Sequence, residues 1–262
     1  MPEGHKTHFW AREHAEMFAG QSVEVSSPQG RFSADARQID GKRLRSVEAI
    51  GKQLFYHFTQ AAILQIHLGR YGSFKLHPSP PPAPVGSIRM RMIGGEHAID
   101  LSGPTTCRVI DEAMMKTIAE KIGPDPLAGG KATDVWKVIS ESRKPIGGIL
   151  LDQQVVAGVG NIFRAELLFE LQLNPLKPGN ELSRQEFDQL WKALVKMMRM
   201  GLKYGKIITV TAKEAGKPLT KLDNKERFRI YGRQNCPRCN SGIEKIKLAG
   251  RDLYVCGNCQ NL

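Results

Sequence analysis

The sequence predicts an α+β multidomain chain, with an N-terminal β-sandwich flanked by helices and a helical C-terminal domain that carries a four-cysteine zinc-finger β-hairpin. Three observations predict this fold class. Short alternating apolar runs fill positions 21–110, helical spacing dominates after position 127, and four cysteines form two close pairs near the end of the 262-residue chain. The expected parts are a sandwich domain at 1–122, a linker at 123–127, a helical domain at 128–227 and a zinc finger at 228–262.

The N-terminal part begins with one helix and continues with strands. Apolar residues at helical spacing predict a helix over 3–19, which Gly20 ends. Residues 21–110 are expected to be mostly short strands, for example 22–26, 44–50, 53–59, 63–68, 73–76, 88–93 and 97–101. The proline-rich run at 78–84 is expected to be a loop, because proline cannot sit in a sheet interior. A short helix is expected at 111–121.

The C-terminal part begins after the breaker cluster at 123–127 and reads as helical. Its expected helices lie at about 133–141, 146–152, 161–171 and 183–203. The polar, basic stretch at 206–226 has no clear period, which predicts a mobile loop.

Two glycines form a tight turn before Asn161, which opens the next helix. Gly158 and Gly160 would let a backbone approach a ligand closely, and a helix N-terminus offers free N–H groups to a phosphate. The alternative is an ordinary packing unit in which Asn161 caps its helix.

The surplus of positive charge is concentrated in the last third of the chain. The net charge is +12, and residues 176–262 hold 18 Lys and Arg against 8 Asp and Glu. Such a surplus attracts a polyanion, with nucleic acid as the leading candidate; a solvated basic surface and an anionic membrane surface are the alternatives. An apolar fraction of 41% excludes disorder. No run of 18 apolar residues or secretory signal occurs, so a cytoplasmic protein without a membrane span is expected.

Four of the five cysteines have the spacing of a metal site. The pairs Cys236–Cys239 and Cys256–Cys259 are separated by 16 residues, which predicts a tetrahedral thiolate site for one structural Zn²⁺. Disulfides are the alternative. Alternating residues between the pairs predict a β-hairpin that turns at Gly250, so that Arg251 lies near its tip. Cys107 is expected to be a buried or neutral thiol.

The N-terminus has the composition of a nucleophile. Removal of Met1 would expose the secondary amine of Pro2, and an α-amino group has a pKa of about 7.7–8.0, well below that of lysine. A secondary amine that attacks a sugar C1′ forms an iminium, which makes the C2′ proton removable. The adjacent Glu3 could act as general acid or base. The alternative is that this short motif occurs by chance.

These motifs together resemble the formamidopyrimidine-DNA glycosylase and endonuclease VIII family of bifunctional base-excision repair enzymes, essentially from end to end. The resemblance rests on Pro2-Glu3-Gly4, Gly51-Lys52, the run His67–Gly72, the linker 123–127, the segment 152–161 as a helix-two-turn-helix, and the four-cysteine finger with Arg251.

The resemblance implies a role for each matching residue. Pro2 would be the Schiff-base nucleophile, Glu3 the proton donor to the sugar, and Lys52 a proton donor in β-elimination that also contacts phosphate. Asn161 and Arg251 would grip the phosphates that flank the lesion, with Arg251 also assigned to δ-elimination. Further expected DNA contacts are Gly160 and Lys144.

The run Arg70-Tyr71 resembles the endonuclease VIII branch, and the Arg-Phe wedge of the formamidopyrimidine branch is absent from 104–110. Tyr71 would stack into the gap left by an everted base. Arg70 replaces an apolar wedge and either favours single-stranded or open substrates or contacts phosphate.

The implied function is excision of oxidised bases, pyrimidines foremost, by a DNA glycosylase/AP lyase. The implied partner is damaged DNA, double-stranded or with single-stranded character, bound by a monomer at the bacterial nucleoid. The alternatives are an 8-oxoguanine/formamidopyrimidine-type glycosylase, a non-catalytic zinc-finger protein that binds damaged or single-stranded DNA, and an unrelated zinc-ribbon RNA-binding protein.

Overall fold

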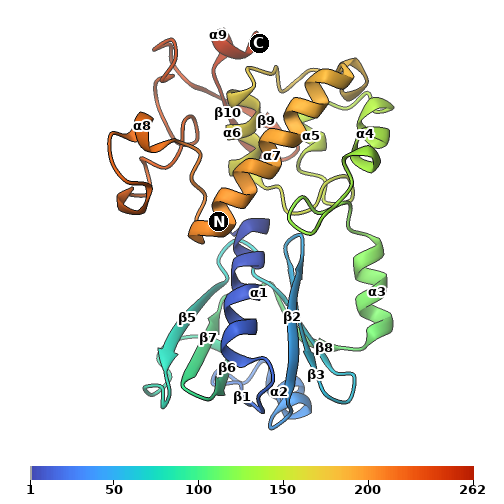
Figure 1. Cartoon of the computed structure of the whole chain (residues 1–262), viewed down its shortest axis with the longest axis vertical. Coiled ribbons are helices and arrows are strands. Elements are labelled where there is room, and N and C mark those ends of the chain that lie inside the picture. Colours follow the sequence, from blue (N-terminus) through green and yellow to red (C-terminus); the bar gives the residue numbers. More distant parts are fainter. Residues whose placement is uncertain (1) are drawn as a thin grey trace. The chain divides into compact units, whose positions relative to one another are not determined.

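The computed structural model describes residues 2–262 and divides at Lys121 into two compact units, each with its own hydrophobic core (Figure 1). The first unit carries the strands of the N-terminal half. The second unit, Ile122–Leu262, carries the longer helices and the C-terminal hairpin.

The first unit is the expected β-sandwich. One antiparallel sheet has the strand order β1-β6-β7-β5, and the other has the order β2-β3-β4-β8. Alternate side chains of both sheets meet in a single apolar core, which includes Phe58, Leu64 and Met92. The strands are β1 (Glu24–Ser26), β2 (Leu44–Ile50), β3 (Gln53–Phe58), β4 (Ile63–His67), β5 (Ser73–Pro78), β6 (Ile88–Gly94), β7 (His97–Ser102) and β8 (Thr106–Ile110).

Three helices accompany the sandwich, and one of them was not predicted. Helix α1 (Gly4–Phe18) packs on β2 and β3, and α3 (Glu112–Glu120) is capped by the side chain of Asp111. Helix α2 (Ser33–Ile39) lies in the stretch that alternation assigned to strands. It is too short for an apolar period, since only Ala36 and Ile39 among its seven residues are buried.

The proline-rich run is a loop from 79 to 84, whereas Pro78, predicted to belong to the loop, ends β5; a buried ion pair fixes the loop. Arg91 and Asp100 are cross-strand partners on β6 and β7, and the guanidinium donates to both carboxylate oxygens at 2.6 and 2.7 Å. A third nitrogen of Arg91 donates to the carbonyl oxygen of Pro82 at 2.7 Å. His77 completes the cluster at 2.9 Å from Asp100.

A fully buried histidine ties α1 to the sheet. The Nδ1 atom of His14 lies 2.6 Å from the Tyr56 hydroxyl, and the imidazole ring contacts the ring of Phe74 at 4.7 Å. Burial, together with the nearby charge of Lys6, lowers the pKa of His14 to about 3. The imidazole is therefore neutral in the folded protein at all pH values near neutrality.

This shift makes stability depend on pH. The folded pKa of His14 is below its unfolded value of 6.5, so the unfolded chain binds the extra proton and stability is lost as pH falls from about 6.5 towards 3. The expected contribution is about 1.4 kcal/mol per pH unit within that window. Urea unfolding at pH 7, 6 and 5 measures it. His14→Phe, which keeps the ring packing, should remove this part of the slope; equal slopes in the two proteins would contradict the assignment.

The second unit is organised around α6 (Asn161–Glu170), whose residues 161–169 are all buried. Helix α7 (Arg184–Tyr204) and the strand β10 (Arg251–Val255) both pack against α6. The other elements are α4 (Ala132–Ser140), α5 (Ile146–Ile149), α8 (Ala212–Ala215), α9 (Gly257–Gln260), β9 (Glu244–Leu248) and the short 3₁₀ turns Gly179–Glu181 and Leu219–Lys221. No helix in residues 2–262 is long and apolar enough to cross a bilayer.

The stretch at 206–226, expected to be a mobile loop, carries a short helix and a 3₁₀ turn. Helix α8 begins with a capping box between Thr211 and Glu214, and a small apolar cluster forms from Ile208, Val210 and Leu222. These apolar residues are too widely spaced to give a sequence period, so the cluster was not predicted.

Candidate active site and nucleic-acid interface

Two motifs that lie far apart in the sequence meet at one end of the first unit. Glu3, which is fully buried, immediately precedes α1. The Thr7 hydroxyl lies 2.6 Å from the carbonyl oxygen of Gly51, in the tight turn between β2 and β3. Gly51 has a positive φ of 57°, and Lys52 follows it directly. The hydrogen bond of Thr7, a residue that the sequence did not single out, therefore places the Lys52 turn beside the first turn of α1.

His67 adds a neutral imidazole to this end of the unit. It lies opposite Gln53 in the β3–β4 ladder, and burial together with the charge of Lys52 lowers its pKa. Its Nδ1 accepts a hydrogen bond from the Gly69 N–H at 3.1 Å, so the ring proton resides on Nε2. His67 is thus a hydrogen-bond donor close to Lys52. The motif containing it was recognised, but it was not predicted to be a site residue.

The turn that follows β4 holds an exposed aromatic ring on a rigid backbone. Gly69 has a φ of 64°, and a Cβ there would lie 1.9 Å from the Thr105 hydroxyl oxygen. The ring of Tyr71 extends into solvent, with 77% of the residue exposed. The guanidinium of Arg70 lies 5.4 Å from the ring centroid. Arg70 and Tyr71 therefore form one projecting cation–π pair.

In the second unit, the start of α6 holds the C-terminal hairpin. The Asn161 side-chain amide donates to the carbonyl oxygen of Asp252 at 2.8 Å, and its oxygen accepts from Arg164 at 2.5 Å. The fully buried Arg164 also donates to the carbonyl oxygens of Gly147 and Leu248, at 3.0 and 3.1 Å. One asparagine and one arginine thus bind both strands of the hairpin to α6.

This tether brings two predicted site residues together. The hairpin turns at Ala249 and Gly250, both with positive φ, and Arg251 follows as the exposed first residue of β10. Arg251 directly precedes Asp252, the residue to which Asn161 donates. Gly160, also predicted, is buried and caps α6. Lys144 is exposed and lies two residues before α5.

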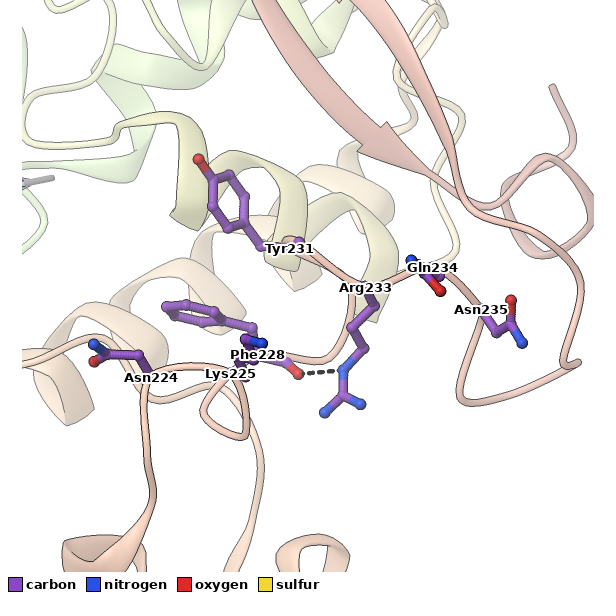
Figure 2. Close-up of a pocket in the computed structure, with 8 residues that line it drawn as sticks. Asn224, Lys225, Phe228, Tyr231, Arg233, Gln234 and Asn235 are labelled. Carbon is purple, nitrogen blue, oxygen red and sulfur yellow. Dashed lines mark hydrogen bonds between the residues drawn. The ribbon is translucent and has the colours of Figure 1, made fainter.

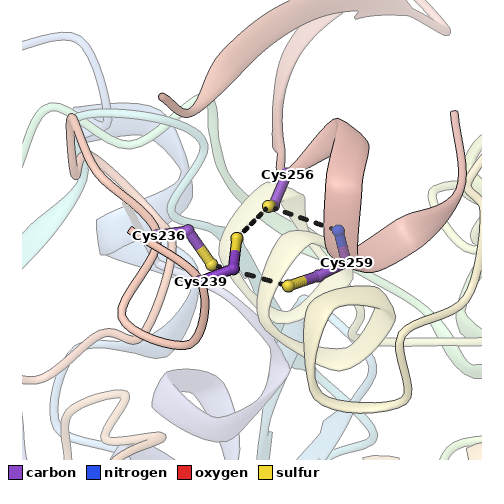
Figure 3. A group of neighbouring side chains, drawn as sticks. All are labelled: Cys236, Cys239, Cys256 and Cys259. Carbon is purple, nitrogen blue, oxygen red and sulfur yellow. Dashed lines mark hydrogen bonds between the residues drawn. The ribbon is translucent and has the colours of Figure 1, made fainter. Parts of the chain in front are cut away.

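The four cysteines of the two pairs converge at the base of the hairpin (Figure 3). Their sulfur atoms all lie within 4.8 Å of one another, with Cys236 and Cys259 at 3.8 Å and Cys239 and Cys256 at 3.5 Å. A tetrahedron with Zn–S bonds of about 2.3 Å has sulfur atoms about 3.8 Å apart, so the cluster fits Zn²⁺. Cys107 lies outside it in β8, and burial raises its pKa to about 12, as expected for a neutral thiol.

The finger is also attached to the C-terminal end of α6. The guanidinium of Arg238 donates to the carbonyl oxygen of Phe169 at 2.7 Å and lies over its ring at 4.6 Å. The side chain of Gln260 donates to the carbonyl oxygen of Leu173 at 3.1 Å. Helix α6 therefore contacts the hairpin at one end and the cysteine cluster at the other, which makes it the platform of the finger.

A groove of about 520 Å³ lies between the end of the 206–226 segment and the finger. Figure 2 draws all of its lining residues and labels all but the glycine; the full set is Asn224, Lys225, Phe228, Tyr231, Gly232, Arg233, Gln234 and Asn235. The groove is lined by aromatic rings, which suit base stacking, and by amides, which suit hydrogen bonds to base edges. Two cations, which suit phosphate, line the same space. This is the chemistry that binds a nucleotide strand.

One buried carboxylate fixes both ends of the 206–226 segment. Glu166 of α6, fully buried, accepts from the Thr209 hydroxyl at 2.5 Å on one side. On the other side it accepts from the backbone N–H groups of Arg229, Ile230 and Tyr231, at 2.8, 3.0 and 2.7 Å. Four donors offset the cost of burying the charge. This role was not predicted, because Glu166 lies within a helix among apolar residues.

Comparison with known proteins accounts for this combination of parts. Residues 1–102 match the formamidopyrimidine-DNA glycosylase N-terminal domain, 122–213 its H2TH domain, and 234–262 a zinc finger found in FPG and IleRS. The chain is 42% identical over 267 residues to Endonuclease 8 1 of Mycobacterium tuberculosis, covering 99% of this chain and all of the relative. The chain belongs to the formamidopyrimidine-DNA glycosylase and endonuclease VIII family.

Other members of the family are more distant. The formamidopyrimidine-DNA glycosylase of Thermomicrobium roseum is 29% identical, over 87% of this chain and 85% of the relative. A crystal structure of Lactococcus lactis Fpg in complex with DNA that contains N7-benzyl-Fapy-dG has the same fold, with a TM-score of 0.82, 23% identity and full coverage of both chains. The higher identity to an endonuclease 8 agrees with the predicted endonuclease VIII-like branch. The family assignment makes the chain a DNA glycosylase of base excision repair.

Proposed function

We propose that the chain is a bifunctional glycosylase/AP lyase that excises oxidised bases, pyrimidines foremost, and then cleaves the strand by β,δ-elimination. The observation that carries the proposal is the hydrogen bond between Thr7 and Gly51, because it draws Lys52 to the helix start where Pro2 and Glu3 lie. An amine nucleophile, a buried carboxylic acid and a cation are the three groups that this chemistry needs.

The proposed reaction begins after removal of Met1, which lies outside the described residues. The Pro2 nitrogen attacks C1′ of the damaged nucleotide, and the base leaves with the electron pair of the glycosidic bond. Glu3 supplies a proton to the sugar as its ring opens, which yields a cationic Schiff base. Loss of the C2′ proton then expels the 3′-phosphate, with Lys52 as proton donor and phosphate contact. A second elimination, assisted by Arg251, expels the 5′-phosphate.

Borohydride trapping tests the proposal. Reduction during reaction with an oligonucleotide containing an abasic site should yield a covalent adduct, which peptide mapping should assign to Pro2. The same assay across thymine glycol, 5-hydroxyuracil and 8-oxoguanine, in single and double strands, tests the lesion preference. Absence of any adduct would favour a DNA-binding protein without catalysis, and dominant cleavage of 8-oxoguanine paired with C would overturn the preference for pyrimidines.

We propose that Asn161 and Arg251 hold the phosphates on either side of the lesion, with Gly160 and Lys144 as further contacts. The tether from Asn161 to Asp252 supports this, since it fixes the hairpin tip beside the start of α6. The groove that contains Phe228 and Tyr231 offers stacking surfaces to the same strand. The chain would bind this DNA as a monomer, at the chromosome.

Arg251→Ala should lower DNA affinity and reduce the salt dependence of binding by about one phosphate equivalent. The β-elimination product should accumulate at the expense of the δ-product, because Arg251 is the group proposed to assist the second step. Gel analysis of product ends and titrations at several salt concentrations measure both effects. Arg251 is exposed and does not belong to the four-cysteine cluster, so the zinc content of the variant should be unchanged. Loss of zinc would show that the role of Arg251 is structural.

Tyr71→Ala tests the proposed wedge. If the ring fills the gap left by an everted base, its removal should weaken binding to a duplex with a lesion by about 1–3 kcal/mol, the usual contribution of one stacked base. Arg70→Ala, which leaves the ring in place, separates two alternatives. A loss confined to single-stranded substrates would assign Arg70 to open DNA, whereas an equal loss on both substrates would assign it to phosphate.

A further inference from the structure

Helix α7 carries a straight row of positive charge that the proposed reaction does not use. Lys192, Lys196, Arg199 and Lys203 are all exposed, and no acidic residue occurs between 192 and 203. At 100° per residue these four side chains fall within an arc of about 60°, and at 1.5 Å per residue they span about 16 Å of the helix axis. We name these four residues the α7 stripe.

Among the described residues, the four side chains of the α7 stripe form no ion pair that would neutralise their charge. The acidic residues of α7 are already paired, Glu186 with Lys177 at 2.7 Å and Asp188 with Arg184 at 2.9 Å. Both pairs precede the stripe. Within residues 2–262, no ion pair involves any of the four stripe cations.

The α7 stripe faces away from the finger. The buried residues of α7 are Phe187, Leu190, Leu194, Met197, Met198 and Gly201, and their mean direction around the helix is opposite to the stripe. That buried face packs on α6, and β10 packs on α6 as well. The stripe therefore points to solvent on a different surface of the second unit from the one that carries Arg251 at the hairpin tip.

We propose that the α7 stripe binds the backbone of a second DNA duplex, so that one chain can bridge two DNA segments. Duplex DNA carries one charge per about 1.7 Å of its axis when both strands are counted, so 16 Å of duplex carries about nine phosphates on its two strands, enough to supply a partner to each of the four cations. Protein interfaces usually contain large apolar anchor side chains. Among the described residues, no large apolar side chain of α7 is exposed. A regular polyanion therefore fits this face better than a protein partner does.

The test uses undamaged DNA, so it does not depend on the proposed chemistry. Two 12-base-pair duplexes, one with a donor dye and one with an acceptor dye, are mixed with the full-length protein in low salt. Energy transfer should appear, and its apparent affinity should fall about 100-fold between 50 and 200 mM salt, as four phosphate contacts require. The combined variant Lys192→Gln, Lys196→Gln, Arg199→Gln and Lys203→Gln should lose the transfer while it still binds one duplex and cleaves a short damaged duplex at the same rate.

A matched control removes the same charge elsewhere, through Lys116→Gln, Lys121→Gln, Lys131→Gln and Lys137→Gln, four exposed lysines outside α7. This control should retain energy transfer. Absence of transfer in the unaltered protein, its persistence in the stripe variant, or an equal loss in the control would each overturn the proposal. If neither the unaltered protein nor the two variants cleaved DNA while bridging behaved as expected, the proposed reaction would be wrong. The proposed binding of a second duplex by the α7 stripe would then still be supported.

Discussion

Glu3→Gln should reduce the rate of base excision by about three orders of magnitude, the middle of the usual range for a lost general acid. Cleavage of a preformed abasic site should change only a few-fold. The difference arises because excision requires a proton as the sugar ring opens, whereas an abasic sugar already equilibrates with its open aldehyde. Single-turnover assays on a damaged duplex and on an abasic duplex measure the two rates separately.

The matched control is Glu16→Gln, which removes an exposed carboxylate from α1, the helix that Glu3 precedes. It should leave both rates unchanged. If the Glu3 variant lost excision and lyase activity to the same degree, Glu3 would act by activating the Pro2 nucleophile or by stabilising the fold, and not as the proton donor to the sugar. Thermal unfolding of the variant distinguishes the last possibility, because Glu3 is fully buried.

Cys259→Ser should release zinc and weaken DNA binding by roughly 100-fold. A structural zinc site contributes about 10–16 kcal/mol to folding, more than so small a module can gain from its core. Without the metal the hairpin would no longer keep Arg251 and Asp252 in position, and Asn161 would lose the carbonyl oxygen to which it donates. The loss of two hydrogen bonds to phosphate, at about 1.5 kcal/mol each, corresponds to that factor of 100.

Cys107→Ser is the control, since Cys107 lies in β8 and outside the cysteine cluster. It should keep one zinc per chain and full DNA affinity. Metal analysis, DNA titration and limited proteolysis of the finger report on the two variants in parallel. Unchanged affinity in a zinc-free protein would show that the finger does not position the DNA contacts.

Local spacing predicted those parts of the fold that depend on few residues close in sequence. The spacing of the cysteine pairs predicted the cluster, and Gly250 between two alternating runs predicted the hairpin turn. Both patterns lie within a short stretch of sequence. Helix α2 was missed, since seven residues with two buried positions carry no measurable period. Strand β8 was also missed, because its half-buried residues alternate weakly.

The site was predicted as a set of motifs, but the contacts that assemble it were not. Thr7 and Gly51 are 44 residues apart, and nothing in either local sequence indicates that one binds the other. Arg164 and Glu166 look like ordinary helix charges, yet both are fully buried and each joins segments more than 60 residues apart. Such long-range polar contacts depend on the tertiary fold, which a one-dimensional pattern does not contain.

Glu166 fixes both endpoints of the segment between Thr209 and Arg229. Because one carboxylate holds Thr209 on the incoming side and residues 229–231 on the outgoing side, the chain between them starts and ends at a fixed point. Residues 211–227 can therefore be replaced as one unit, provided that the replacement keeps an apolar residue at Leu222, which packs with Ile208 and Val210. Grafting the corresponding stretch from another member of the family onto these fixed ends is a direct test of whether the segment sets substrate preference.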